Sequence, residues 1–177
     1  RGESLVAMTE DMLQRIFNEA VPDFSATVCG QAKFDDLSVD AIEEFRKRWE
    51  QKSGNSILKQ STPWQLLHDA ELVHDNGITY AALILFGKHS SLGKLLSQAE
   101  VVFEYRSNKT AGPANQRVEF REGFFLYYDK LWELINLRNN LQHFQDGLFM
   151  RDIPTFSERT IREAVLNAVS HRDYQHP

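Results

Sequence analysis

The sequence has one cysteine, no long hydrophobic run and no excess of positive charge, and each shortage excludes a class of protein. Because Cys29 stands alone, no disulfide can form within the chain, which fits a protein of the reducing cytoplasm. The longest apolar run, Tyr80 to Phe86, has seven residues, whereas a helix that crosses a bilayer needs about 20. We therefore expect a cytoplasmic protein without a membrane partner.

The charge of the chain argues against direct DNA binding. Its 20 basic and 25 acidic residues give a net charge of −5, and non-specific DNA binding depends on Lys and Arg side chains that neutralise phosphates. If the protein binds DNA, we expect a neighbouring domain to make the contacts. The composition, 42% hydrophobic and 25% charged, is that of an ordinary globular protein. A length of 177 residues suffices for one domain with an appendage.

The spacing of apolar residues predicts most of the secondary structure. Steps of three and four residues predict helices over residues 4–20, 38–51, 63–70, 91–98 and 124–139. Ser38 and Pro63 are typical of helix starts. Residues 99–105 and 117–120 have the character of strands. A polar segment that contains His143 then leads to Pro154.

The stretch from Leu72 to Phe86 predicts a hairpin and a buried strand. Asn76-Gly77 is typical of a type I′ turn, which joins two antiparallel strands. The residues that follow, about 78–86, hardly alternate between apolar and polar, and such a run predicts a strand buried on both faces. Helices and strands are intermixed along the chain. We therefore predict an α+β fold, with a small mixed sheet around a central strand 78–86 and several helices packed on it.

The same pattern predicts three segments. Residues 1–33 are expected to form a leader helix and an extended segment, residues 34–152 an α+β linker domain, and residues 153–177 the start of another unit. Because the chain opens on Arg1 rather than methionine, we expect it to be a piece of a longer protein.

The last predicted helix carries the candidate functional residues. Thr155-Phe156-Ser157-Glu158 is a capping-box pattern, so we expect a helix that starts there and runs to about Ser170. Glu163, Asn167 and His171 recur every four residues, which places a carboxylate, an amide and an imidazole on one face. The opposite face is expected to be a buried back made of Ile161, Ala164, Val165 and Ala168. Spacing alone fits a solvated helix face equally well.

Two motifs of the chain resemble one known family. Residues 163–174 read E-A-V-L-N-A-V-S-H-R-D-Y. They are similar to the E-A-x-x-N-A-x-x-H-R-D-Y signature that opens the ATPase-like domain of RecG-related transcriptional regulators. Residues 79–88, T-Y-A-A-L-I-L-F-G-K, resemble the T-x-A-x-x-L-L-F-G-K strand of that family. The opening residues 1–4, R-G-E-S, look like the end of the Schlafen AlbA-like DNA-binding domain that precedes these segments.

The resemblance implies a nucleotide site of the GHKL type. By this likeness Glu163 would orient or deprotonate the water that attacks the γ-phosphate of ATP, and Asn167 would hold a magnesium ion. His171 and Arg172 would approach phosphate or tie the helix end to the next strand. The adenine-binding motif and the glycine-rich lid would lie beyond Pro177. ATP and magnesium are therefore expected as cofactors of the longer protein and not of this chain alone.

The resemblance supports two interpretations of function. In the first, the chain is a linker module of a bacterial DNA-binding transcriptional regulator. It would relay the state of a DNA-binding domain to an ATP-binding domain, or hold two protomers together as a homodimer. In the second, it is part of an enzyme, a magnesium-dependent ATPase or an ATP-dependent helicase-related protein, with Glu163 and Asn167 carrying the chemistry. The chain by itself is not expected to be catalytic.

Overall fold

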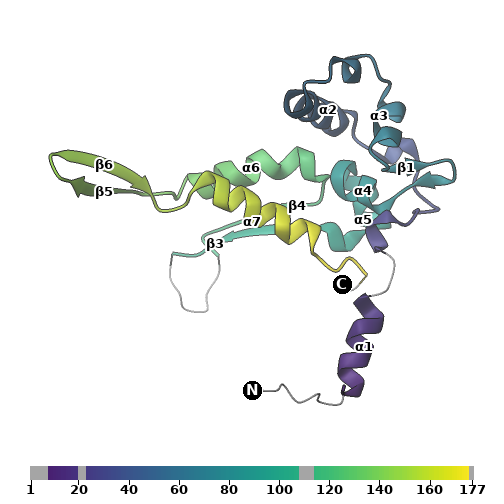
Figure 1. Cartoon of the computed structure of the whole chain (residues 1–177), viewed down its shortest axis with the longest axis horizontal. Helices are drawn as coiled ribbons and strands as arrows, with labels where there is room; N and C mark the ends of the chain where they lie inside the picture. Colours follow the sequence, from purple (N-terminus) through teal and green to yellow (C-terminus); the bar gives the residue numbers. More distant parts are fainter. Residues whose placement is uncertain (1–7, 20–22, 108–113, 176–177) are drawn as a thin grey trace, which may run out of the picture.

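The computed structural model describes residues 8–19, 23–107 and 114–175, and of residues 15–19 it describes the backbone alone (Figure 1). Over these residues the chain forms seven α-helices and three two-stranded antiparallel sheets, so the predicted α+β class is confirmed. The helices are α1 (Glu10–Glu19), α2 (Val39–Ser53), α3 (Pro63–Asp69), α4 (Tyr80–Phe86), α5 (His89–Leu95), α6 (Phe124–Asn136) and α7 (Glu158–Ser170). The strands are β1 (Val73–His74), β2 (Gly77–Ile78), β3 (Val101–Tyr105), β4 (Gln116–Phe120), β5 (Leu141–Asp146) and β6 (Phe149–Pro154). Each described helix is too short or too polar to span a bilayer.

Side-chain caps fix the starts of the predicted helices. The Ser38 hydroxyl accepts a hydrogen bond from the Ala41 amide at 3.4 Å, at the start of α2. Thr62 and Gln65 form a reciprocal capping box at the start of α3. Such caps satisfy backbone amides that have no partner within the helix. Helices α2, α3, α5 and α6 confirm the predictions to within a few residues, and α1 confirms the described part of the predicted helix 4–20.

The predicted central strand over residues 78–86 is wrong, because Tyr80–Phe86 forms helix α4. Thr79, which is fully buried, caps this helix by accepting a hydrogen bond from the Ala82 amide at 3.2 Å, and Gly87 ends it. A helix that is surrounded by protein needs no polar face. An apolar run of this length therefore fits a buried helix as well as a buried strand. The local cap and the packing of its neighbours decide for the helix.

The described strands form three antiparallel pairs rather than one mixed sheet, which is a second correction. The β1–β2 hairpin confirms the predicted one, with His74 opposite Gly77. Its turn is not of the expected type I′, because Asp75 and Asn76 occupy the two turn positions and neither has a positive φ. Strands β3 and β4 pair along their whole length, from Val101 opposite Phe120 onward.

A further hairpin, β5–β6, lies where the sequence predicted a polar connection to Pro154. Gly147, with a φ of 63°, occupies the first of its two turn positions, as in a type II′ turn. Asp146-Gly147 is itself a hairpin signal, and the sequence interpretation overlooked it. In Figure 1 this hairpin projects away from the body of the molecule.

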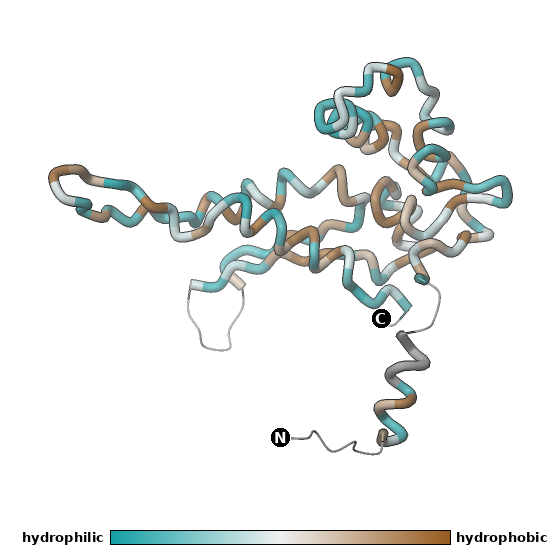
Figure 2. The backbone as a smooth tube through the Cα atoms, viewed as in Figure 1, coloured by the Kyte–Doolittle hydropathy of each residue, from teal (hydrophilic) through white to brown (hydrophobic). Residues whose placement is uncertain are grey.

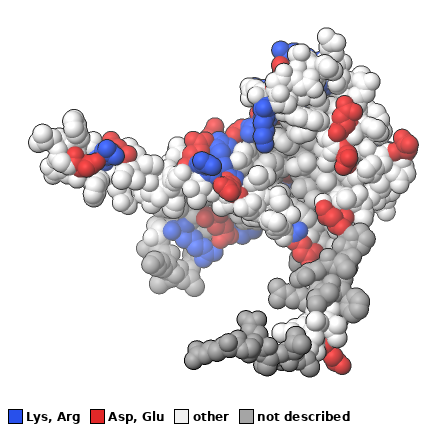
Figure 3. Space-filling view, viewed as in Figure 1, with Lys and Arg blue, Asp and Glu red and all other residues white. Residues whose placement is uncertain are grey.

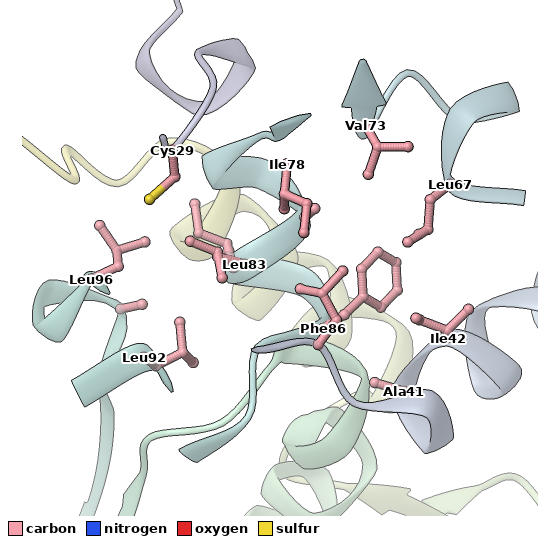
Figure 4. Packing of buried hydrophobic residues seen from close by; sticks show 14 of the residues in the cluster. Cys29, Ala41, Ile42, Leu67, Val73, Ile78, Leu83, Phe86, Leu92 and Leu96 are labelled. Carbon is pink, nitrogen blue, oxygen red and sulfur yellow. The ribbon is translucent and has the colours of Figure 1, made fainter. Parts of the chain in front are cut away.

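Two groups of buried side chains hold the body together. The larger group surrounds α4 and contains Ile42, Leu83 and Phe86, which lie close together in Figure 4. The smaller group joins α6 to the β3–β4 pair and contains Phe120 and Tyr127. A backbone contact between the end of α4 and the start of α6 joins the two groups.

The backbone contact between α4 and α6 depends on Gly123, which precedes α6. Its amide donates to the Gly87 carbonyl oxygen at 2.8 Å, just after α4. A Cβ atom at position 123 would lie 2.6 Å from the Leu85 carbonyl oxygen and 2.6 Å from the Cα of Phe86. Only a residue without a side chain allows α6 to begin this close to α4.

We predict that Gly123→Ala lowers the free energy of unfolding by about 1–3 kcal/mol, because the added methyl group meets backbone atoms that cannot move aside. The matched control is Gly93→Ala in α5, where the nearest atom to the new Cβ would be the Arg121 Cδ at 3.6 Å. Since alanine favours a helix over glycine, the control should be neutral or stabilising. Urea denaturation of both variants measures the difference, and equal effects would contradict the close-contact explanation.

Candidate functional site

Helix α7 carries the candidate residues on an exposed face. Glu163 and Asn167 lie one turn apart, and both side chains are exposed. His171 follows at the C-terminal end of the helix, where its amide donates to the Asn167 carbonyl oxygen at 2.9 Å. The imidazole of His171 is exposed as well. The structure therefore presents a carboxylate and an amide together, with a histidine at the helix end.

The predicted capping box at the start of α7 does not form. Ser157 occupies the capping position, without a side-chain hydrogen bond to the helix. The hydroxyl of Thr155 instead donates to the Asn140 carbonyl oxygen at 2.9 Å. This bond joins the two ends of the β5–β6 hairpin, whose presence the sequence interpretation did not anticipate.

The opposite face of α7 packs on the smaller core group. Val165 and Val169 contact that group, and Ile161 is half-buried beside them. Ala164 and Ala168, which were expected in this buried back, are exposed instead. Residues 161, 165 and 169 follow one another at four-residue steps and form the buried row, so the two alanines fall on its flanks.

An ion-pair bridge fixes α7 to two other helices. One carboxylate oxygen of Asp129, in α6, accepts from Arg162 of α7 at 2.8 Å, and the other accepts from Arg48 of α2. Arg162 also pairs with Glu158 at 2.7 Å, and its guanidinium carbon lies 4.8 Å from the centre of the Tyr128 ring. A planar guanidinium suits both contacts. We call Arg48, Asp129 and Arg162 the Asp129 bridge.

In the Asp129 bridge, the carboxylate and the arginines favour one another's ionised forms. Burial works against ionisation of Asp129, but the hydrogen bonds and positive charges of Arg162 and Arg48 outweigh it, so the pKa of this carboxyl lies below its usual value. Burial likewise works against the charge of Arg162, and its hydrogen bonds to Glu158 and Asp129 outweigh burial and raise the pKa of the guanidinium. Both shifts favour the ionised forms of Asp129 and Arg162 at neutral pH.

Arg172 is directed away from the exposed face that carries Glu163 and Asn167. Its Nη1 donates to the Glu100 carbonyl oxygen at 2.8 Å, just before β3. The buried Tyr174 donates its hydroxyl to the Val169 carbonyl oxygen at 2.9 Å. These two contacts fasten the residues after α7 to the body of the protein.

A small cavity of about 240 Å³ lies behind α7. Its wall is mainly apolar and includes Val101, Leu131, Val165 and Tyr174. Neither Glu163 nor Asn167 lines it. The candidate residues face outward, so a ligand that they bind must be enclosed by other residues.

The donor set on α7 fits part of a magnesium site rather than a whole one. Magnesium prefers oxygen ligands and usually keeps several waters and phosphate oxygens beside one or two protein ligands. The side-chain oxygens of Asn167 and Glu163 are ligands of this kind. Within the described parts of the chain, no group of three or more His, Cys, Asp or Glu side chains could hold a metal ion.

Comparison with known proteins places the chain in a family. A family described as "Domain of unknown function (DUF8451)" matches residues 12–102, a little more than half of the chain. The chain belongs to the DUF8451 family. The DUF8451 match runs from α1 to the second residue of β3, so α6, the β5–β6 hairpin and α7 lie beyond it. No match was found among curated proteins.

One solved structure shares the fold. It is the DIP2311 protein from Corynebacterium diphtheriae, which is 19% identical to this DUF8451 chain, with a TM-score of 0.59. The similarity covers 91% of this chain and 31% of that one. The DUF8451 chain therefore spans about a third of the length of its structural neighbour, and at this level of identity the likeness concerns the fold alone.

The Asp129 bridge is the part of the site that the sequence did not reveal. Arg48 and Asp129 are 81 positions apart, and Asp129 and Arg162 are 33 apart. No periodic pattern links residues at such separations. The one local signal is the position of Arg162, which directly follows Ile161 of the buried row of α7.

We predict that Asp129→Asn destabilises the protein by about 1 kcal/mol at neutral pH, since it removes the charge that joins two arginines at a partly exposed site. It should also speed amide hydrogen exchange in α7. Because the pKa of Asp129 is lowered in the folded state, its contribution is complete above the usual carboxyl value of 3.8 and is lost as pH falls through the lowered value. The difference between the native chain and the variant should shrink over that range.

The control for this prediction is Asp75→Asn, an exposed aspartate in the β1–β2 turn. It should change stability by less than about 0.5 kcal/mol and leave exchange in α7 unaltered. Urea denaturation and hydrogen exchange followed by mass spectrometry measure both variants. If exchange in α7 is the same in Asp129→Asn as in the native chain, the bridge does not hold this helix.

Proposed function

We propose that the chain is a linking module of a cytoplasmic, DNA-binding transcriptional regulator, in which α7 presents Glu163 and Asn167 to a nucleotide site that a longer protein completes. One observation carries the proposal. The two side chains lie one turn apart on the exposed face of a helix whose opposite face is anchored by Val165, Val169 and the Asp129 bridge. A helix held in this way keeps its functional side chains in one orientation.

The residue types suit a magnesium–nucleotide ligand. When bound, the metal would neutralise phosphate charge. Asn167 would hold it through the side-chain amide oxygen, and Glu163 would orient a water beside it. Both groups point away from the body, so binding would cost little rearrangement of this chain.

The Asp129 bridge supports the linking part of the proposal. It connects α7, through Asp129 of α6, to α2, which belongs to the DUF8451 region. A shift of α7 on nucleotide binding would change the geometry at Asp129 and hence the position of Arg48. The bridge is thus a physical route between the two parts of the chain.

The charge distribution favours DNA binding by another domain. On the face drawn in Figure 3, Lys and Arg side chains lie among Asp and Glu rather than forming a separate patch. Several arginines of the chain are ion-paired, among them Arg117 with Glu104 at 2.7 Å and Arg121 with Glu100 at 2.7 Å. An arginine that is already paired with a carboxylate neutralises DNA phosphates poorly. It therefore releases few counterions and adds little affinity for DNA.

In the full-length protein, we predict that Asn167→Ala weakens magnesium-dependent ATP binding at least about tenfold, because a metal ligand is lost. Glu163→Gln should leave binding nearly unchanged and lower any ATP turnover. The matched control is Glu133→Gln on the neighbouring α6, an exposed glutamate outside the site. Titration with a fluorescent ATP analogue and a phosphate-release assay measure the two quantities.

The outcomes separate the linking module from an enzyme. Binding that depends on Asn167, with no turnover in the native protein, supports a nucleotide-sensing linker. Turnover that Glu163→Gln abolishes supports an ATPase instead. If the native protein does not bind ATP, or if Asn167→Ala binds it as well as the control does, the proposed role of α7 is wrong.

A further inference from the structure

The β5–β6 hairpin (residues 141–154) is an apolar surface without a partner in the described chain. Every residue of its two strands is exposed. Six large apolar side chains on it are 51–98% exposed: Leu141, Phe144, Leu148, Phe149, Met150 and Ile153. Figure 2 shows hydrophobic residues (brown) at the tip of the hairpin, away from the body of the molecule. A lone two-stranded hairpin is marginally stable in water, and an exposed apolar patch of this kind marks an interaction site.

The charged side chains of the hairpin pair with one another. His143 contacts Asp152 at 2.6 Å, and Arg151 pairs with Asp146 at 3.1 Å. With one arginine against two aspartates, the surface does not attract nucleic acid. Since both aspartates already have a side-chain partner within the hairpin, the surface suits an apolar partner.

A cavity of about 520 Å³ lies at the root of the same hairpin. Asn140 and Thr155, the residues that flank the two strands, contribute to its wall. Most of the remaining wall is apolar, and Glu104 and Arg138 add a charged group each. The apolar residues are Phe103, Tyr105, Ile135, Leu137 and Phe156. One side is held in place by Arg138, which lies 4.5 Å from the centre of the Tyr105 ring and donates to Gln116 at 2.6 Å. The volume is in the range of cavities that hold a ligand of moderate size.

We propose that the partner is a second copy of this chain, and that the two copies exchange hairpins. In a dimer with a two-fold axis, the two hairpins lie antiparallel, so that the tip of each reaches the root of the other. Leu148 and Phe149 at each tip then enter the cavity beside Leu137 of the partner copy. Each strand of six residues is about 20 Å long, so a tip cannot reach the root of its own hairpin. The contact forms twice, as two-fold symmetry requires.

The exposed area agrees with this arrangement. The strand register puts Phe144, Phe149 and Ile153 on one face of the hairpin and Leu141 and Met150 on the other. At about 200 Å² for a fully exposed large side chain, the first face, Leu148 at the tip, and Leu137 and Phe156 of the cavity wall together expose roughly 800 Å². This is about the area that each partner buries in a stable interface of standard size. The tip and the cavity both belong to this chain, so the dimer needs no other component. The proposal stands independently of nucleotide binding by α7.

We predict that the 177-residue chain sediments with twice its mass of 20.5 kDa at micromolar concentrations. Leu148→Asp and Phe149→Asp should each weaken the dimer at least about a hundredfold, because a carboxylate would have to replace an apolar side chain in a mainly apolar cavity. Both positions are exposed, so folding should be unaffected, and circular dichroism checks this. The matched control is Ile57→Asp, an equally exposed apolar position (70%) between α2 and α3, which should remain dimeric.

Disulfide trapping tests the geometry of the exchange. The double variant Leu148→Cys, Leu137→Cys should form a covalent dimer on oxidation, and each single variant should form much less. The native Cys29 is buried and does not interfere. A native chain that is monomeric, a dimer that survives both tip variants, or a double variant that traps no more dimer than the single ones would each overturn the proposal. A full-length protein that is monomeric with a protected hairpin would show that its own remaining chain covers the tip, and would overturn it too.

Discussion

The burial of helix α4, in which Ala82, Leu83, Ile84 and Phe86 are buried and the other three residues are half-buried, is the constraint on which the rest of the structure depends. Its C-terminal end is the point where three segments meet: the Ser38 amide donates to the Phe86 carbonyl oxygen at 2.7 Å, and the Gly123 amide donates to the Gly87 carbonyl oxygen at 2.8 Å. Helices α2 and α6 therefore begin at the same place and lie against each other. This common origin brings Arg48 of α2 within reach of α6, so the ion-pair bridge to α7 is a consequence of how α4 is packed.

Helix α6 connects the packed region around α4 to the outer parts of the molecule. It starts against α4, carries Asp129 in its middle and ends beside the cavity at the root of the β5–β6 hairpin. Two surfaces of different character result. One is the polar face of α7, with Glu163 and Asn167, and the other is the apolar hairpin. Since both are attached to the same helix, a ligand on one surface and a partner on the other would act on a shared support.

The family match and the proposed functional surfaces occupy different parts of the chain. The DUF8451 region ends within β3 and contains α4 and most of the larger core group. The α7 face and the hairpin lie beyond it. The region shared within the family therefore supplies the buried framework, and the surfaces available for recognition are built on α6 and the residues that follow it.

The sequence by itself determined the features that depend on short stretches of chain. The helix starts at Ser38 and Pro63, and the four-residue spacing of Glu163 and Asn167, depend on a turn or two of helix, so they could be read directly. The packing around residues 80–86, together with the Thr79 cap, decided that they form a helix, because an apolar run fits a strand as well until its neighbours surround it. The tertiary structure alone decided the pairing of Asp129 with two arginines far away in the sequence, since long-range contacts arise from packing that no local pattern encodes.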